Sequence, residues 1–231
     1  MLEELKQELD KKKNSEQGKF LSRYFKTGKG EYGEGDIFLG IKVPMMREIS
    51  DRYKELDLKD VKELLASEIH EYKLAAFLIL VHRYGRNKKE IFDFYMNNLR
   101  GINNWDLVDL SAPNIVGDFL FHNPSEIKVL ENMAYSKNIW ERRIAIVSTY
   151  AFIKEGKFDE ALKISKILIK DKHDLIHKAA GWMLREVGKR NREVLESFLK
   201  ENYKNMPRTM LRYAIEKFPE SIRKDYLKGR I

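Results

Sequence analysis

The sequence has no cysteine, which excludes disulfide bonds and thiolate chemistry and favours a reducing, cytoplasmic location. Only five prolines and no linker of low complexity occur, so one uninterrupted domain is expected over residues 1–231. No run approaches the roughly 18 apolar residues of a membrane span, and the N-terminus MLEELKQELDKKK lacks the apolar core of a signal peptide. Convincing strand alternation is also missing, which indicates an all-α fold.

Positive charge is concentrated in the last third of the chain. Residues 1–160 carry 26 Lys and Arg against 27 Asp and Glu, whereas residues 161–231 carry 18 against 9. A basic surface of this kind suits a polyanion, above all nucleic acid. A solvated, lysine-rich helical surface fits the charge equally well, so charge alone does not decide between the two.

Apolar residues recur at helical spacing along most of the chain. Ser15 is expected to cap the helix SEQGKFLSRYF, and Pro44 suits a first helical turn because its missing N–H would have no partner there. Further helices are expected in SEIHEYKLAAFLILVHRYG, NKKEIFDFYMNNL, NPSEIKVLENMAY, IWERRIAIVSTYAFIKEG and DLIHKAAGWMLREVGKR. The sequence thus predicts a helical hairpin and glycine-rich loop over residues 1–43 and helical repeats over residues 44–231.

Small residues inside the more apolar helices recur at nearly constant spacing. Ala75, Ala112, Ala145, Ala180 and Ala214 are separated by 37, 33, 35 and 34 residues. Such a period is typical of solenoids, in which each helix pair packs its apolar face on the next pair. The tetratricopeptide pattern W-x2-L-G-x2-Y is absent, which favours a HEAT-like superhelix lined on its inner face by the second helix of each pair.

Two other patterns lack the context that ligand binding requires. Gly28, Gly30 and Gly33 satisfy G-x-G-x-x-G, but no strand precedes them, so a connecting loop is favoured over a nucleotide site. His173 and His177 lie four residues apart without a third ligand, so a surface histidine pair is favoured over a metal site. No cofactor and no metal is expected.

The stretch GINNWDLVDLSA places Trp105 and Asp109 four residues apart, on one face of a helix. Relative to the repeat alanines, Asp109 lies at −3, Arg143 at −2 and Trp182 at +2, with Arg185 three residues after Trp182. These positions belong to the same helix of successive repeats. Stacking of the repeats is therefore expected to bring them to one groove.

A structural role is the alternative for each of these residues. A tryptophan at helical spacing is most often a core residue, and Asp109 could pair with Arg143 as a buried bridge between repeats. Asp106 is placed either to share the face of Asp109 or only to cap the helix, and Arg142 fits solvent as well as a ligand. The convergence of two tryptophans, an aspartate and an arginine beside a basic region favours a functional groove.

Four stretches also carry a family resemblance. They are FLSRYFKTGKGEYGEGDIFLGIKVPMMREI (residues 20–49), NNWDLVDLSAPNIVGDFLF (103–121), KNIWERRIAIV (137–147) and IHKAAGWMLREV (176–187). In these stretches the chain resembles the bacterial DNA alkylation repair family of AlkD-type glycosylases, over essentially its whole length. The resemblance implies an all-α, right-handed superhelical solenoid of HEAT-like (armadillo-like) repeats with a concave basic groove.

The resemblance also implies roles for individual residues. Asp109 takes the position of the catalytic carboxylate, and Trp105 and Trp182 take the aromatic walls of the cleft. Arg143 takes the basic position beside them, and Tyr24 a position near the DNA backbone. Arg185 is expected to bind DNA as well. Asn104 stands where family members can carry a second tryptophan, and it is expected to alter the edge of the cleft.

The implied function is excision of positively charged N3- or N7-alkylated purines, such as 3-methyladenine and 7-methylguanine, from duplex DNA in base excision repair. A carboxylate would stabilise an oxocarbenium-like deoxyribose without deep flipping of the base. The expected partner is alkylated double-stranded DNA, bound by a cytoplasmic monomer with no membrane and no obligate protein partner. Two alternatives stay open: a non-catalytic DNA-binding relative with the same fold, and a protein-interaction scaffold.

Overall fold

A computed structural model describes residues 1–231 and is helical, with no strand and a single isolated bridge between Ile37 and Ile69. The prediction of an all-α fold is therefore confirmed. The chain forms two compact units, Met1–Ser111 and Ala112–Ile231. The expected organisation as one repeat domain stays a prediction. None of the helices combines the length and the hydropathy needed to cross a bilayer.

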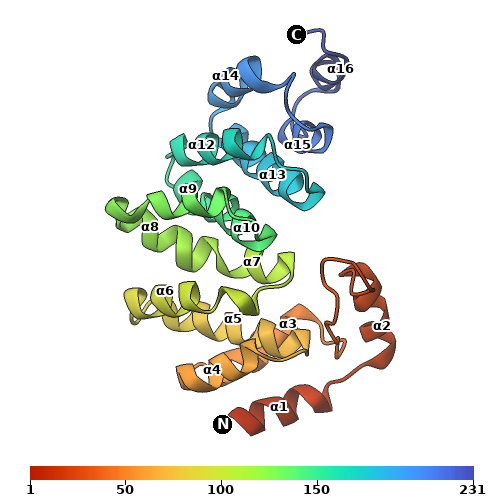
Figure 1. The fold of residues 1–231 in the computed structure, drawn as a ribbon, viewed down its shortest axis with the longest axis vertical. Helices are drawn as coiled ribbons and strands as arrows, with labels where there is room; N and C mark the ends of the chain where they lie inside the picture. Colours follow the sequence, from red (N-terminus) through yellow and green to blue (C-terminus); the bar gives the residue numbers. More distant parts are fainter. The chain divides into compact units, whose positions relative to one another are not determined.

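The first unit is built around one nearly buried helix, α5, which packs against α1, α3, α4, α6 and α7 (Figure 1). Its sequence HEYKLAAFLILVHRY buries almost every side chain, so the helix can be contacted from all sides. The helices of this unit are α1 (Leu2–Lys11), α2 (Ser15–Tyr24), α3 (Val43–Arg52), α4 (Leu58–Leu65), α5 (His70–Tyr84), α6 (Lys88–Asn97), the short 3₁₀ helix η1 (Leu99–Gly101) and α7 (Trp105–Ser111).

The helix starts in this unit differ in part from the prediction. Asn14, not Ser15, caps α2, because the Asn14 side chain accepts a hydrogen bond from the N–H of Gln17 (3.0 Å). Pro44 lies in the first turn of α3, as expected. The helix expected from Ser67 begins at His70, because the Ile37–Ile69 bridge holds the preceding residues in an extended conformation.

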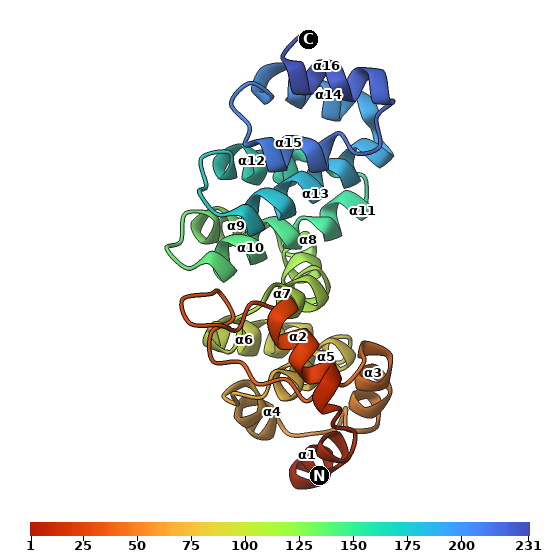
Figure 2. The same cartoon turned by 90° about the vertical axis from the view of Figure 1, so that its right-hand side faces the viewer.

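The second unit has α13 at its centre, in contact with α10, α11, α12, α14 and α15 (Figure 2). The predicted segment DLIHKAAGWMLREVGKR coincides with this helix from end to end. The elements of the unit are the π-helical turn η2 (Pro113–Gly117), α8 (Asp118–His122), the 3₁₀ turn η3 (Pro124–Glu126), α9 (Lys128–Ala134), α10 (Ile139–Ser148), α11 (Tyr150–Lys154), α12 (Asp159–Leu168), α13 (Asp174–Arg190), α14 (Arg192–Asn202), α15 (Arg208–Ala214) and α16 (Glu220–Lys228).

Two helices expected to be continuous in this unit are interrupted. IWERRIAIVSTYAFIKEG divides at Thr149 into α10 and α11, where the Thr149 hydroxyl donates to the carbonyl oxygen of Ile146 (2.6 Å). A hydroxyl that bonds to its own backbone in this way competes with the helical ladder. NPSEIKVLENMAY begins with the 3₁₀ turn η3 before α9.

The repeat alanines are interior residues. All five have at most 1% of their surface exposed: Ala75, Ala112, Ala145, Ala180 and Ala214. Within each unit the helices that carry or adjoin them contact one another, as α5 with α7, α10 with α13, and α13 with α15. Small side chains are needed there because the helices approach closely. A Cβ on Gly181 of α13 would lie 2.5 Å from the Met210 carbonyl oxygen of α15.

Candidate functional site

The candidate carboxylate and its neighbouring tryptophan lie on the short helix α7 of the first unit. Trp105 is the first residue of α7, and Asp109 follows one turn later. The N–H of Trp105 donates to Asn104 Oδ1 (2.9 Å), while the Asn104 amide donates to the carbonyl oxygen of Phe25 (3.4 Å). Asn104 is completely buried. Asn104 therefore joins α7 to the end of α2, and its expected effect on the edge of the cleft stays a prediction.

Aromatic contacts hold the Trp105 ring. It stacks on Phe25, with ring centroids 5.1 Å apart and planes 20° apart, and meets Tyr24 edge-on at 6.0 Å. Phe25 is itself buried and stacks on Phe38 at 5.0 Å. The structure thus brings together two of the predicted site residues, Trp105 and Tyr24. Offset stacks and edge contacts of this kind fix ring orientation.

Asp109 is half-buried and interacts with its surroundings. Burial raises the pKa of the Tyr95 hydroxyl on α6, and the negative charge of Asp109 raises it further. The hydrogen bond between Tyr95 and the Ser111 hydroxyl (3.0 Å) acts in the opposite direction. The carboxylate of Asp109 therefore lies within electrostatic reach of the α6–α7 interior, in a region of low dielectric constant.

A cluster of polar and charged side chains lies next to Trp105 in the fold. We call it the His70 cluster, and its members are Asp36, His70, Lys73, Asn103 and Asp106. His70 bonds through Nδ1 to Asp36 (3.0 Å) and through Nε2 to Asp106 (2.8 Å). The second oxygen of Asp36 accepts hydrogen bonds from the Lys73 ammonium and from the Asn103 amide (2.7 Å). Lys73 also donates to Asn103 Oδ1 (2.9 Å).

The charges of this cluster are set by its geometry. Burial favours neutral imidazole, but Asp106 and Asp36 outweigh it and raise the pKa of His70 to about 9. At neutral pH His70 is therefore an imidazolium that donates one hydrogen bond to each carboxylate. Burial also opposes ionisation of Asp36, yet the bonds from His70 and Lys73 lower its pKa below the usual range.

No motif in the sequence indicates this cluster, apart from Asp106 itself. Asp36 precedes His70 by 34 residues, and Asp106 follows it by 36, so no local spacing links them. One oxygen of the Asp106 carboxylate is bonded to His70, and the other has no hydrogen-bond partner. A role of Asp106 beside Asp109 stays a prediction. Through its bond to His70, Asp106 anchors the first turn of α7, directly after Trp105.

Arg143 and Arg142 lie side by side in the sequence of α10 but have different surroundings. Arg143 is 5% exposed, and its guanidinium donates to the carbonyl oxygen of Leu175 at the start of α13 (2.7 Å). Arg142 donates to the Asp171 carboxylate (2.5 Å) and to the carbonyl oxygen of Ser136 (2.9 Å). Arg142 is thus committed to contacts within the second unit.

Trp182 and Arg185 lie on α13. The partly exposed Trp182 ring is 6.3 Å from that of Tyr150, and the Arg190 guanidinium lies over the same tyrosine at 5.6 Å. Arg185 forms an ion pair with Glu216, which offsets part of the positive charge that a phosphate would meet. Lys154 adds a second cation 5.8 Å from the Tyr150 ring. An aromatic pair bordered by basic residues results.

The two glycine- and histidine-based patterns have local structural roles. The N–H of Gly28 donates to Glu31 and that of Gly30 to Glu34, both at 2.8 Å, so carboxylates of the loop itself occupy these amides. No strand precedes the loop. At the start of α13, His173 Nδ1 accepts from the N–H of Leu175 (3.2 Å). His177 lies one turn later and bonds to the carbonyl oxygen of Asp171 (2.7 Å).

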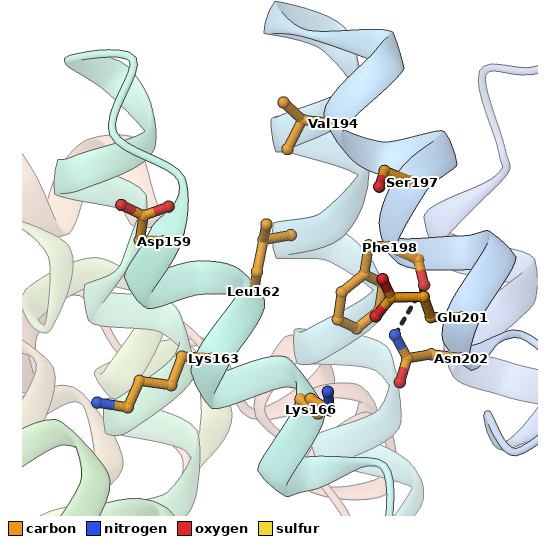
Figure 3. A pocket seen from close by; sticks show the side chains of 9 residues that line it. All are labelled: Asp159, Leu162, Lys163, Lys166, Val194, Ser197, Phe198, Glu201 and Asn202. Atoms are coloured by element: carbon orange, nitrogen blue, oxygen red, sulfur yellow. Dashed lines mark hydrogen bonds between the residues drawn. The ribbon is translucent and has the colours of Figure 1, made fainter.

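The second unit has a pocket of about 410 Å³ between α12 and α14 (Figure 3). Its walls combine charged ends such as Lys163 and Glu201 with an apolar floor around Phe198. Lys163 is paired with Glu131 (2.5 Å). None of the candidate residues of this unit lines the pocket. This pocket is therefore not part of the candidate site.

The candidate residues fall in both units. Trp105, Asp109 and Tyr24 belong to the first, and Arg143, Trp182 and Arg185 belong to the second. The first group is joined by the aromatic contacts around Trp105, while Arg143 and Trp182 lie on helices in mutual contact, α10 and α13. Their union in one groove stays a prediction.

Comparisons with known proteins indicate the fold and the family of the chain. No curated protein matches the chain. A solved structure described as a predicted DNA alkylation repair enzyme from Enterococcus faecalis superposes with a TM-score of 0.74 at 19% identity. The match covers 90% of this chain and 98% of the other, and shows a shared fold. The family model for DNA alkylation repair enzymes matches residues 5–218. The chain therefore belongs to the DNA alkylation repair enzyme family.

Proposed function

We propose that this protein is a DNA glycosylase that removes positively charged N3- and N7-alkylated purines from duplex DNA. The observation that carries the proposal is the position of Asp109, one turn after a tryptophan whose ring is fixed by Phe25 and Tyr24. Membership of the DNA alkylation repair enzyme family supports it. The family indicates a role in DNA repair. The choice of a glycosylase rests on the chemistry that Asp109 could perform.

The chemistry requires little from the protein. An alkylated N3 or N7 makes the purine a cation, so the bond from C1′ to the base nitrogen breaks with its electron pair moving to the base, which leaves neutral. Positive charge then develops on the deoxyribose. In our proposal the Asp109 carboxylate stabilises this charge and orients a water for attack at C1′, and the water's proton passes to the carboxylate. One carboxylate suffices because the base is already cationic and needs no general acid. Glycosides with an uncharged base or sugar as leaving group need a second carboxyl group to protonate it.

DNA binding would involve the remaining candidates. In our proposal the repeats form a HEAT-like solenoid with a concave basic groove, where Trp105 and Trp182 border the lesion nucleotide. Arg143 would stabilise the site beside the carboxylate, while Tyr24 and Arg185 would contact the backbone. Residues 161–231 carry 18 basic and 9 acidic residues, and this excess of positive charge would attract the phosphates.

Selectivity would come from the lability of the glycosidic bond. Duplex DNA with single 7-methylguanine, 3-methyladenine or uracil residues tests this with the native chain. We expect release of both alkylated purines and retention of uracil, because uracil is uncharged in DNA and would have to leave as an anion, which makes it a poor leaving group. Efficient uracil release would contradict the proposal. DNA binding without any base release would indicate a non-catalytic relative. Peptide binding that is insensitive to salt would indicate a protein-interaction scaffold.

A further inference from the structure

The most exposed aromatic pair in the first unit lies on α2. Phe20 and Tyr24 are one helical turn apart, are 60% and 56% exposed, and stack with ring centroids 6.3 Å apart and planes 13° apart. Their helical spacing would suit a core-facing stripe, yet they face solvent. We call this pair the α2 aromatic shelf. Large adjacent apolar side chains on a surface commonly mark an interaction site.

The orientation of α2 is fixed, so the shelf cannot turn inward. A Cβ on Gly18 would lie 2.6 Å from the Phe38 carbonyl oxygen, which shows how closely the opposite face of α2 approaches the segment after the glycine-rich loop. The N–H of Asn14 also donates to the Leu39 carbonyl oxygen (2.8 Å). That segment is anchored in turn by buried Glu71, whose carboxylate accepts from the N–H of Leu39 (2.8 Å) and two following amides.

The shelf is continuous with Trp105 and is bordered by positive charge. Tyr24 meets the edge of Trp105 at 6.0 Å, so three aromatic rings follow one another from Phe20 to α7. Residues 19–29 contain four basic residues and no acidic one: Lys19, Arg23, Lys26 and Lys29. All four are exposed, and Lys26 lies 3.9 Å from the nearest carboxylate, that of Glu31.

We propose that the α2 aromatic shelf is a stacking site for an unpaired DNA base, with Lys19 and Arg23 at the flanking phosphates. The inference rests on the proposed function only for the choice of DNA as the ligand. Aromatic faces beside cations are the combination that binds single-stranded nucleic acid, because every base has a π face and every nucleotide a phosphate. Phe20 thereby becomes a DNA-contacting residue, with a role that does not involve the glycosidic bond.

The test uses undamaged DNA and the full-length chain. Affinity is measured by fluorescence anisotropy for a fully paired duplex and for the same duplex with one unpaired adenine. We expect the native chain to prefer the bulged duplex by about tenfold, the size of one base–aromatic stack. Phe20→Ala should abolish the preference and leave affinity for the paired duplex unchanged, and Phe20→Tyr should retain it.

Tyr135→Ala is the matched control, since Tyr135 belongs to the second unit and is 73% exposed. It should retain the preference for the bulge. An unchanged preference in Phe20→Ala would overturn the proposal, as would equal binding of the two duplexes by the native chain. Because no lesion and no base release are involved, this result stands or fails independently of the glycosylase activity.

Discussion

His70 donates a hydrogen bond through Nε2 to Asp106 (2.8 Å), the residue that follows Trp105 in the first turn of α7. The same imidazolium bonds to Asp36, at the end of the glycine-rich loop, through its other nitrogen. One buried cation therefore ties the loop to the helix that carries Asp109. Both ends depend on His70 being charged, because neutral imidazole has only one N–H to donate.

The first prediction concerns the pH dependence of stability. His70 has an ordinary pKa of 6.5 when unfolded and a pKa of about 9 when folded. The folded state therefore binds more protons between these values, so the stabilisation is complete below pH 6.5 and is lost as pH rises through 9. We expect the free energy of unfolding to fall by about 3 kcal/mol over this window.

Urea unfolding at successive pH values checks this prediction. In His70→Asn the decline between neutral and alkaline pH should be largely absent, because the titrating group is gone. The groups that face His70 are Asp36 from the loop, Asp106 from α7, and Lys73 on its own helix, and they remain in the variant. His122→Asn, at an exposed histidine of the second unit, should retain the native profile. Parallel profiles of native chain and His70→Asn would refute the assignment.

The second prediction concerns the close approach of α13 and α15. In Gly181→Ala the new methyl group would meet the Met210 carbonyl oxygen and the Tyr213 Cβ, each at 2.5 Å. We expect a loss of about 1–3 kcal/mol in unfolding free energy, because the helices must separate. Gly85→Ala is the control, since nothing lies within 4 Å of its added Cβ. Equal stability of the two variants would show that the helices are less closely packed.

The third prediction separates DNA binding from a scaffold role. Duplex affinity, followed by anisotropy, should fall at least about tenfold between about 50 and about 200 mM salt, because bound phosphates release counterions. Lys154→Ala should reduce the slope of log affinity against log salt by about one, because its ammonium, beside the Tyr150 ring, is expected to contact one phosphate. Affinity that is independent of salt would favour a scaffold.

The helical class and many of the helices could be predicted because they depend on local periodicity. The helix α13 matches its predicted segment throughout, and the repeat alanines are all buried. The orientation of α2 could not be predicted, because it depends on a tertiary contact at Gly18 that exposes Phe20 and Tyr24. Amphipathic spacing alone does not reveal which side of such a helix faces the core.

The candidate site could be predicted only where a motif is continuous in the sequence. Trp105 and Asp109 are recognisable because they share one helix face. The His70 cluster could not be predicted, because its members come from a loop, α5 and α7 and meet only after folding. The burial of Asn104 could not be predicted for a similar reason, since its side chain bonds to the distant carbonyl of Phe25.

The measurement that tests the central claim most directly is single-turnover release of 7-methylguanine from duplex DNA by the native chain and by Asp109→Asn. Asp93→Asn, at an exposed carboxylate of α6, is the matched control. We predict release by the native chain and the control, and a loss of at least about 100-fold in Asp109→Asn, with duplex affinity retained, because removal of a charge-stabilising group costs this much. Undiminished release by Asp109→Asn would contradict the assignment of Asp109 as the catalytic carboxylate.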